Sequence, residues 1–285
     1  MFVGCEWTWA RPVHDIPDQE IVKIKDGYVF LNQTWERYHP FNFPNLPNRL
    51  AHVESAKDIT QFVERYGVLG YQELTQENPR FDTYTVGDPV DWFLQQAKTV
   101  RFALQLINAV QEDKDKEQVK KLIYSAQVQV PMRMFVEGAP EYAKTKAHCF
   151  AEGPETVFRP LIQPDIWEGK YKALAIQMAS HLINTNSRGV SRVIGLMEKN
   201  SMPVIPCQFV QLLNGRSLIE AIWHQVGDAA LNPSGKGTRI CNECGLPFIV
   251  TDKRQKFCPG DEFSAGSLCG TRKRVRELRA NKKKK

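Results

Sequence analysis

The chain has 285 residues, of which 42% are hydrophobic and 25% charged, and its formal net charge is +6 at pH 7. This is enough apolar material to bury a core, and no stretch approaches the 18 consecutive apolar residues of a membrane-spanning helix. The start, MFVGCEWTWARP, has neither the basic region nor the long apolar segment of a secretion signal, so we expect a cytoplasmic protein with no membrane partner.

The positive charge is concentrated at the C-terminal end of the chain. Residues 236–285 hold 14 Lys and Arg against 5 Asp and Glu, whereas residues 1–235 hold 24 against 27. A nearly neutral body with a cationic arm is the distribution expected of a protein that contacts a polyanion. A basic terminus that is simply solvated is the alternative interpretation.

The first predicted element is a β-hairpin. Residues 20–32 alternate apolar and polar side chains on both sides of Asp26-Gly27, a dipeptide suited to a tight turn with positive φ. The aromatic and proline-rich stretch 35–47 is expected to be an irregular connection packed on the body.

Two helices are predicted next. Ser55, with Asp58 three residues later, forms a capping box for a short helix that Gly67 can end. Asp88 as N-cap and Pro89 as first helical residue begin a longer helix, whose apolar stripe runs to Val110 and faces the core. A charged link, 111–118, leads to another helix over 116–127.

The rest of the body has fewer signals. Residues 170–183 have helical periodicity, and 190–213 predict two short strands around Lys199-Asn200. Ser217 and Glu220 form a second capping box, for a helix that runs to residue 230. The segment LNPSGKG, 231–237, contains Pro and two Gly and is interpreted as a hinge. We therefore predict a body domain, 1–235, and a small C-terminal module, 236–285.

Four of the seven cysteines lie in this module with the spacing C-x2-C-x13-C-x10-C: Cys241, Cys244, Cys258 and Cys269. A C-x-x-C turn directs two thiolates at one ion, and the second pair completes a tetrahedron. We predict a hairpin between the pairs, with strands at 246–250 and 255–257, and a helix after Cys269 on which Val275 and Leu278 pack inward. This order of elements is that of a treble-clef-like zinc module.

Four thiolates leave no open position on the ion, so the predicted zinc is structural and supplies folding free energy that so small a core lacks. Reduced cysteines in a flexible tail are the alternative. The other three, Cys5, Cys149 and Cys207, are interpreted as small buried hydrophobes or unreactive thiols. An odd number of cysteines in this arrangement does not indicate a disulfide framework.

No catalytic motif is present: the chain lacks a phosphate-binding glycine loop, a nucleophile elbow and an H-E-x-x-H pattern. His148-Cys149 has no family signature around it, and His181 and His224 are interpreted as ordinary helical histidines. We expect that the protein is not an enzyme. A hydrolase site hidden in the body is a third, less favoured interpretation.

The C-terminal end resembles the CGNR zinc finger, found in bacterial proteins whose N-terminal region is called the ABATE domain and which are described as stress-induced transcription regulators. The resemblance lies in CNEC at 241–244, Phe248, RQKFC at 254–258 and CGTRKRVR at 269–276. It implies a zinc-ligand role for the same four cysteines. Thr271 replaces the motif's Asn, and the spacer between Cys258 and Cys269 is longer than in the family. The resemblance covers about one sixth of the chain.

The cations of the module predict nucleic-acid contact. Residues 272–285 contain nine Lys and Arg against Glu277 alone, and on a helix such charges can lie along a phosphate backbone. The candidate contact residues are Arg254, Lys256, Arg272, Lys273, Arg274, Arg276 and Arg279. DNA is favoured over RNA, for which Phe248 or Phe257 would be the stacking surfaces.

The expected fold is thus α+β, with a predominantly helical body carrying β-hairpins and a small C-terminal zinc module. The expected function is that of a nucleic-acid-binding transcription regulator, in which the body senses a signal, forms a homodimer or binds a protein partner. The alternative is an interaction or scaffold protein in which zinc is a purely structural clip and the basic arm contacts an acidic partner.

Overall fold

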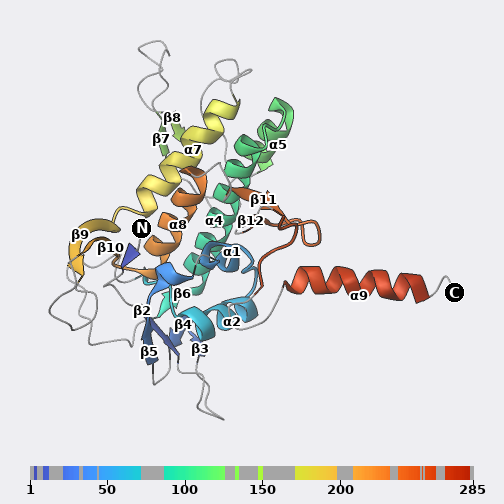
Figure 1. Ribbon diagram of the computed structural model, residues 1–285. Helices are drawn as coiled ribbons and strands as arrows, with labels where there is room; N and C mark the ends of the chain where they lie inside the picture. Colours follow the sequence, from blue (N-terminus) through green and yellow to red (C-terminus); the bar gives the residue numbers. More distant parts are fainter. Residues whose placement is uncertain are drawn as a thin grey trace. The chain divides into compact units, whose positions relative to one another are not determined.

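The computed structural model describes residues 3–4, 9–12, 22–31, 35–43, 45–71, 87–125, 132–134, 147–149, 171–197, 208–231, 237–250, 252, 254–260 and 267–282 (Figure 1). The described chain is mostly helical with small, mainly antiparallel sheets and a C-terminal cluster of four cysteines, as expected. In the part of the chain so described, no helix combines the length and the apolar character needed to cross a membrane.

The helices have the following bounds: α1 Leu46–Ala51, α2 Ala56–Tyr66, α4 Val90–Gln111, α5 Lys116–Ser125, α7 Tyr171–Asn186, α8 Leu218–Leu231 and α9 Leu268–Lys282, with a short 3-10 helix, η1, at Pro40–Asn42. The strands are β1 Val3–Gly4, β2 Trp9–Pro12, β3 Val22–Lys25, β4 Tyr28–Leu31, β5 Trp35–Tyr38, β6 Asp88–Pro89, β7 Met132–Met134, β8 Ala147–Cys149, β9 Ser191–Met197, β10 Gln208–Asn214, β11 Thr238–Ile240 and β12 Pro247–Ile249.

The chain folds as two compact units, each built from separate stretches of sequence. The first comprises Met1–Leu46, Glu54–Leu94 and Asn186–Gln225, and the second comprises Pro47–Val53, Gln95–Thr185 and Val226–Lys285. The cysteine module belongs to the second unit together with most of α1, α4 and α7. The predicted division into a body domain, 1–235, and a C-terminal module, 236–285, stays a prediction.

The predicted N-terminal hairpin is confirmed. β3 and β4 pair antiparallel with Lys25 opposite Tyr28, and the two residues between them have positive φ, 50° at Asp26 and 79° at Gly27. The sheet continues to β6 and has the order β3-β4-β6. The strand pair predicted over 190–213 is also confirmed as β9 and β10, with Asn214 opposite Ser191.

The capping box of α2 is present as predicted. Ser55 Oγ accepts a hydrogen bond from the Asp58 N–H, and the Asp58 carboxylate accepts one from the Ser55 N–H. The pKa of Asp58 is lowered, mainly because its carboxylate accepts a hydrogen bond from the Ser55 hydroxyl. Gly67 ends the helix with a φ of 82°.

The predicted start of the long helix needs a correction at Asp88 and Pro89. These two residues pair with β4, and α4 begins at Val90. The buried Asp88 carboxylate accepts hydrogen bonds from the backbone N–H groups of Leu69, Gly70 and Tyr71, so its role includes holding this segment in place. Such a cluster of N–H donors satisfies a buried carboxylate. The apolar stripe of α4 is confirmed, with Phe93 and Leu104 fully buried.

The second predicted capping box forms in part. Ser217 Oγ accepts from the Glu220 N–H at 3.4 Å, as predicted for the start of α8. The Glu220 carboxylate, however, accepts from the backbone N–H and the guanidinium of Arg216 rather than completing the reciprocal bond to Ser217. The nearby arginine competes for the carboxylate because a charged donor forms the stronger hydrogen bond.

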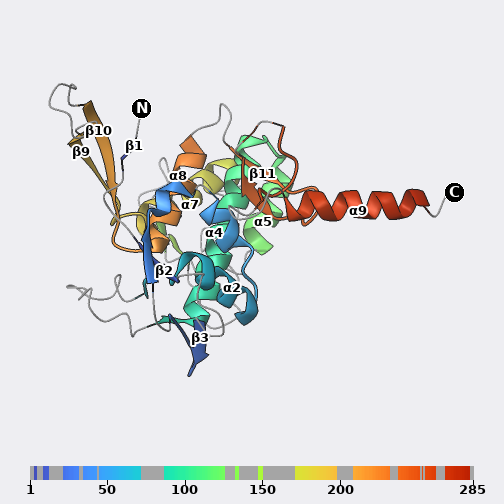
Figure 2. The same ribbon diagram turned by 60° about the horizontal axis from the view of Figure 1, so that its bottom comes forward.

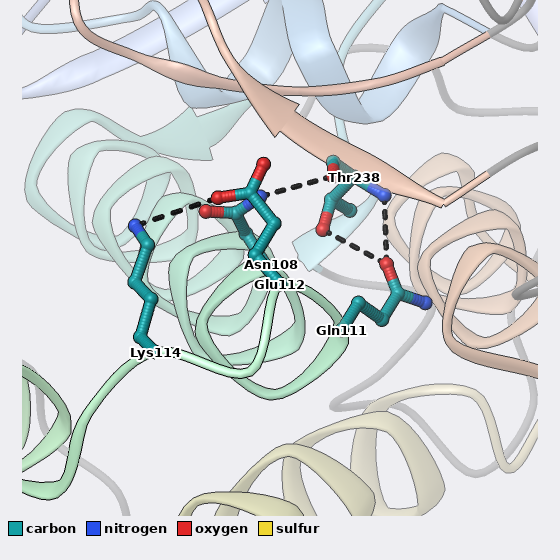
Figure 3. A network of polar contacts seen from close by, with 5 residues as sticks. All are labelled: Asn108, Gln111, Glu112, Lys114 and Thr238. Carbon is teal, nitrogen blue, oxygen red and sulfur yellow. Dashed lines mark hydrogen bonds and ion pairs between the residues drawn. The ribbon is translucent and has the colours of Figure 1, made fainter.

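A polar network in the second unit fixes β11 on α4 (Figure 3). Asn108 Nδ2 donates to the Thr238 carbonyl at 3.0 Å, and the Thr238 N–H donates to Gln111 Oε1 at 2.9 Å. Gln111 Nε2 donates to the Ala229 carbonyl of α8 at 3.1 Å. Two amide side chains from one helix turn therefore satisfy backbone groups at the entrance to the cysteine module.

Candidate metal centre

The C-x-x-C turn begins the site. The Cys241 N–H donates to the Leu246 carbonyl at 2.9 Å, and the Gly245 N–H donates to the Cys241 carbonyl at 3.0 Å. Gly245 has a φ of 72°, a conformation that a residue with a side chain adopts at an energetic cost. The glycine that follows the second cysteine is therefore required by the turn. It is a sequence signal for the site in addition to the spacing of the cysteines.

The strands of the module differ from those predicted. β12 pairs antiparallel with β11, which precedes the first cysteine, with Thr238 opposite Ile249 and Ile240 opposite Pro247. The predicted second strand at 255–257 is wrong, since these residues are not in a strand. The C-x-x-C turn therefore joins β11 to β12, and the chain reverses its direction at Gly245.

A small apolar core surrounds the sulfurs. Cys241, Cys258 and Cys269 are buried with Phe248 and Val250, and Phe257 packs against this group. Phe248 is fully buried and lies in this core. Cys244 is the exposed member of the four cysteines.

The four cysteine sulfurs lie together as the sequence predicts. All four Sγ atoms are within 4.8 Å of one another, and those of Cys244 and Cys258 are 3.4 Å apart. In a tetrahedral site with metal–sulfur bonds of about 2.3 Å, the sulfurs stand about 3.8 Å apart. The arrangement is therefore that of a site that can hold one metal ion, and it is consistent with a zinc-binding module.

Backbone donors stabilise the first thiolate. Burial alone would raise the pKa of Cys241, but N–H groups of Cys244, Glu243 and Cys258 outweigh it and lower the pKa to about 7. Two of these donors, from Glu243 and Cys258, lie 3.5 and 3.4 Å from the sulfur. Hydrogen bonds to the charged form favour ionisation.

The second pair of thiols behaves in the opposite way. Burial, followed by the neighbouring Cys244 and Cys241 sulfurs, raises the pKa of Cys269 to about 12, and burial with the same neighbours also raises the pKa of Cys258. Several thiolates cannot share so small a volume without a compensating cation. The chemistry of the site thus calls for a positive ion.

The long spacer before Cys269 leaves the cluster intact. Ser267 stands before α9, and its Oγ accepts from the Gly270 N–H at 3.1 Å while its carbonyl accepts from the Thr271 N–H at 2.9 Å. Cys269 is the second residue of α9, so its sulfur stands at the positive end of the helix. Thr271 itself is exposed.

The apolar residues of α9 are placed differently from the prediction. Val275 and Leu278 are 40% and 63% exposed, so they do not pack inward. Residues 271–280 are all exposed apart from Lys273, and α9 leads away from β11 (Figure 2). Helical periodicity identifies which face is apolar, but it does not say that anything covers that face.

The predicted nucleic-acid contact residues divide by their surroundings. Arg276 forms an ion pair with Glu243 of the C-x-x-C turn, and Lys273 lies over the ring of Phe257, 5.4 Å from its centroid. Arg274 Nε donates to the Gly270 carbonyl at 3.4 Å. The other four residues are exposed: Arg254, Lys256, Arg272 and Arg279. Among them, Arg254 forms an ion pair with Asp252, with 3.5 Å between Nη2 and Oδ2.

One residue close to the sulfurs was not foreseen. His52, which follows α1, has its Nε2 atom 3.3 Å from Cys258 Sγ and 3.7 Å from Cys244 Sγ. The sequence contains no signal for it, because 206 positions separate it from Cys258. The remaining cysteines stay untested: Cys5, Cys207 and the side chain of Cys149 lie outside the described residues.

Comparison with models of known protein families, with curated proteins and with solved structures found no match. The resemblance to the CGNR finger therefore rests on the residues that carry it.

Proposed function

We propose that this protein is a zinc-finger protein whose C-terminal helix binds nucleic acid. The observation that carries the proposal is that α9 has a cysteine of the candidate metal centre as its second residue and exposes Arg272, Arg274 and Arg279 beyond it. A structural zinc ion would hold the start of the helix, and the helix would lie along a phosphate backbone.

Zinc is the ion that best suits the donors. Four thiolates are soft ligands, and a tetrahedron of four cysteine sulfurs is a common structural zinc site. The ion would be structural because no coordination position is left for water or substrate. The same reasoning supports a binding protein rather than an enzyme.

The charges of α9 support a phosphate contact. Arg272, Arg274 and Arg279 extend from the exposed helix, and the lysines at 282–285 follow in the sequence. If about five phosphates are neutralised, the logarithm of affinity falls with the logarithm of salt with a slope of about −4.5. DNA is the proposed ligand in preference to RNA, because Phe248 is fully buried and Phe257 packs against the core of the module with Lys273 over its ring.

The wider role follows from the CGNR resemblance. It supports a cytoplasmic bacterial transcription regulator in which residues 1–235 sense a signal, form a homodimer or hold a protein partner. Reduced, clustered cysteines are in keeping with the cytoplasm.

A second candidate is favoured by the exposed apolar residues of α9. Val275 and Leu278 interrupt the cations, and side chains of this kind suit contact with a protein surface. In this alternative, zinc is a structural clip, and the basic helix contacts an acidic partner.

Salt-dependent binding separates the two candidates. Fluorescence anisotropy with a duplex DNA and with a single-stranded RNA, across a salt series, is measured for the intact protein and for Arg272→Gln/Arg274→Gln/Arg279→Gln. Arg276 is left unchanged because its ion pair with Glu243 belongs to the module. If α9 binds DNA, the variant should have a weaker affinity for DNA, and its slope of log affinity against log salt concentration should be shallower by up to about 2.7.

The matched control removes three positive charges elsewhere. Lys23, Lys25 and Lys57 are exposed, and changing all three to Gln should leave the slope within about 1 of its original value. Equal affinity of the α9 variant and the original chain for DNA would remove α9 from the contact and favour the protein-partner alternative.

A further inference from the structure

His52 stands at the metal centre although it comes from the opposite end of the second unit's sequence. Its Nε2 atom is 3.3 Å from Cys258 Sγ and 3.7 Å from Cys244 Sγ. A nitrogen and a sulfur bound to the same tetrahedral zinc ion stand about 3.5 Å apart, given bonds of about 2.0 and 2.3 Å. Both distances are therefore close to those between ligands of one ion.

The other ring nitrogen sets the tautomer. His52 Nδ1 contacts the Asn48 backbone carbonyl at hydrogen-bond distance, and a carbonyl can only accept, so Nδ1 carries the hydrogen. In the neutral ring, Nε2 then has a lone pair directed at the sulfurs. A histidine that binds a metal through one nitrogen commonly donates its other N–H to a carbonyl in this way.

The backbone on either side of His52 is held firmly. Arg101 Nε donates to the Ala51 carbonyl at 2.7 Å, and its Nη2 donates to the Val53 carbonyl at 3.3 Å. Asn48 Oδ1 accepts from the Ile249 N–H of β12 at 2.7 Å. The ring is thus fixed with respect to the strand that carries the core of the cysteine module.

Cys244 is the ligand that His52 is best placed to replace. It is the exposed cysteine, so reagents and oxidants reach it first, and its sulfur lies next to Nε2. We propose that His52 is a reserve ligand: in a chain that lacks the Cys244 thiolate, a bond from the metal to His52 Nε2 takes the place of the missing metal–sulfur bond. The centre then continues with three sulfur ligands and one nitrogen ligand. The exchange transfers no electrons, and the inference rests on the metal site of the proposed function.

The test is a double-mutant cycle on the full-length protein. Zinc affinity is measured by competition with a chelator for the original chain, Cys244→Ala, His52→Ala and the double variant. The proposal predicts that Cys244→Ala still binds one zinc ion. It also predicts that His52→Ala lowers the zinc affinity by up to about tenfold when Cys244 is present and by about 100-fold or more when Cys244 is absent. Equal costs in both backgrounds would make His52 a structural residue only and overturn the proposal, as would the loss of all zinc from Cys244→Ala.

Cobalt spectroscopy gives a second readout. In the Co²⁺-loaded Cys244→Ala variant, the thiolate charge-transfer band should correspond to three sulfurs, and the ligand-field bands should move when His52 is also changed. His52→Gln, which keeps a polar side chain of similar size, replaces His52→Ala if the latter does not fold by circular dichroism. His181→Ala is the matched control and should not change the spectrum. If the original chain binds neither metal, the metal site of the proposed function fails; if it binds and the cycle is additive, only the role of His52 fails.

Discussion

The backbone N–H of Cys258 donates a hydrogen bond to the sulfur of Cys241 across 3.4 Å. This bond joins the C-x-x-C turn to the second cysteine pair, which lies on the far side of β12 in the sequence. It also stabilises the Cys241 thiolate, whose pKa falls to about 7. The centre is therefore partly organised for a cation by the fold itself.

Removal of the Cys241 sulfur should remove most of the metal. Cys241→Ser replaces a buried ligand at the start of the turn, and structural zinc sites contribute folding free energy directly. We expect sub-stoichiometric zinc in the purified variant by elemental analysis, and a lower thermal midpoint. Cys5→Ser is the control, since Cys5 is not one of the four, and it should keep a full zinc complement.

Metal binding should release protons. Near pH 7.5, Cys258 and Cys269 are protonated in the metal-free protein because their pKa values are raised, that of Cys269 to about 12. Both must ionise to bind zinc, so at least two protons leave. Calorimetric titrations in two buffers of different ionisation enthalpy give this number. A release below one proton would mean that these thiols do not bind as thiolates.

The stability of the metal-free protein should depend on pH in two directions. Cys241 has a lowered pKa, so its contribution is present above the unfolded thiol value of about 8.5 and is lost as pH falls through about 7. Cys258 and Cys269 have raised pKa values, so the folded state loses stability as pH rises above about 8.5. Urea unfolding of the reduced, metal-free protein from pH 6.5 to 10.5 tests this.

Zinc should remove the fall above pH 8.5 and steepen the rise below it, because the folded protein then holds all four sulfurs as thiolates while the unfolded chain still binds protons below about pH 8.5. Cys269→Ser provides a further comparison, since the metal-free variant should lose less stability above pH 8.5 than the original chain. A metal-free curve that keeps rising above pH 9 would contradict the assignment of the raised pKa values.

The contact between α4 and β11 should be important for stability. Asn108 is fully buried, and its amide donates to the Thr238 carbonyl (Figure 3). Asn108→Ala leaves that carbonyl without this donor and should lower the free energy of unfolding by about 1–3 kcal/mol. Urea unfolding measures the change. Gln118→Ala, an exposed position on α5, should change it by less than about 0.5 kcal/mol.

Local signals in the sequence were sufficient for several elements. Asp26-Gly27 fixes its own turn, Ser55 and Asp58 cap a helix within four residues, and the stripe of α4 follows from helical periodicity. The four cysteines were found because ligand spacing reflects the geometry of a single ion. In each case the interacting residues lie close in the sequence or share one strict chemical requirement.

What was missed depends on contacts between distant segments. The partner of β12 is β11 because Gly245 reverses the chain and the amides of α4 hold Thr238. The position of His52 follows from the packing of α1 beside the module, for which no local pattern exists. The exposure of Leu278 depends on what surrounds α9, and periodicity alone carries no such information.

The most direct test of the central claim is zinc X-ray absorption spectroscopy of the intact, purified protein, combined with its zinc content. The account predicts one zinc ion per chain and a first shell of four sulfurs at about 2.3 Å. A chain that purifies and reconstitutes without zinc, or a first shell made mainly of oxygen or nitrogen at about 2.0 Å, would contradict it.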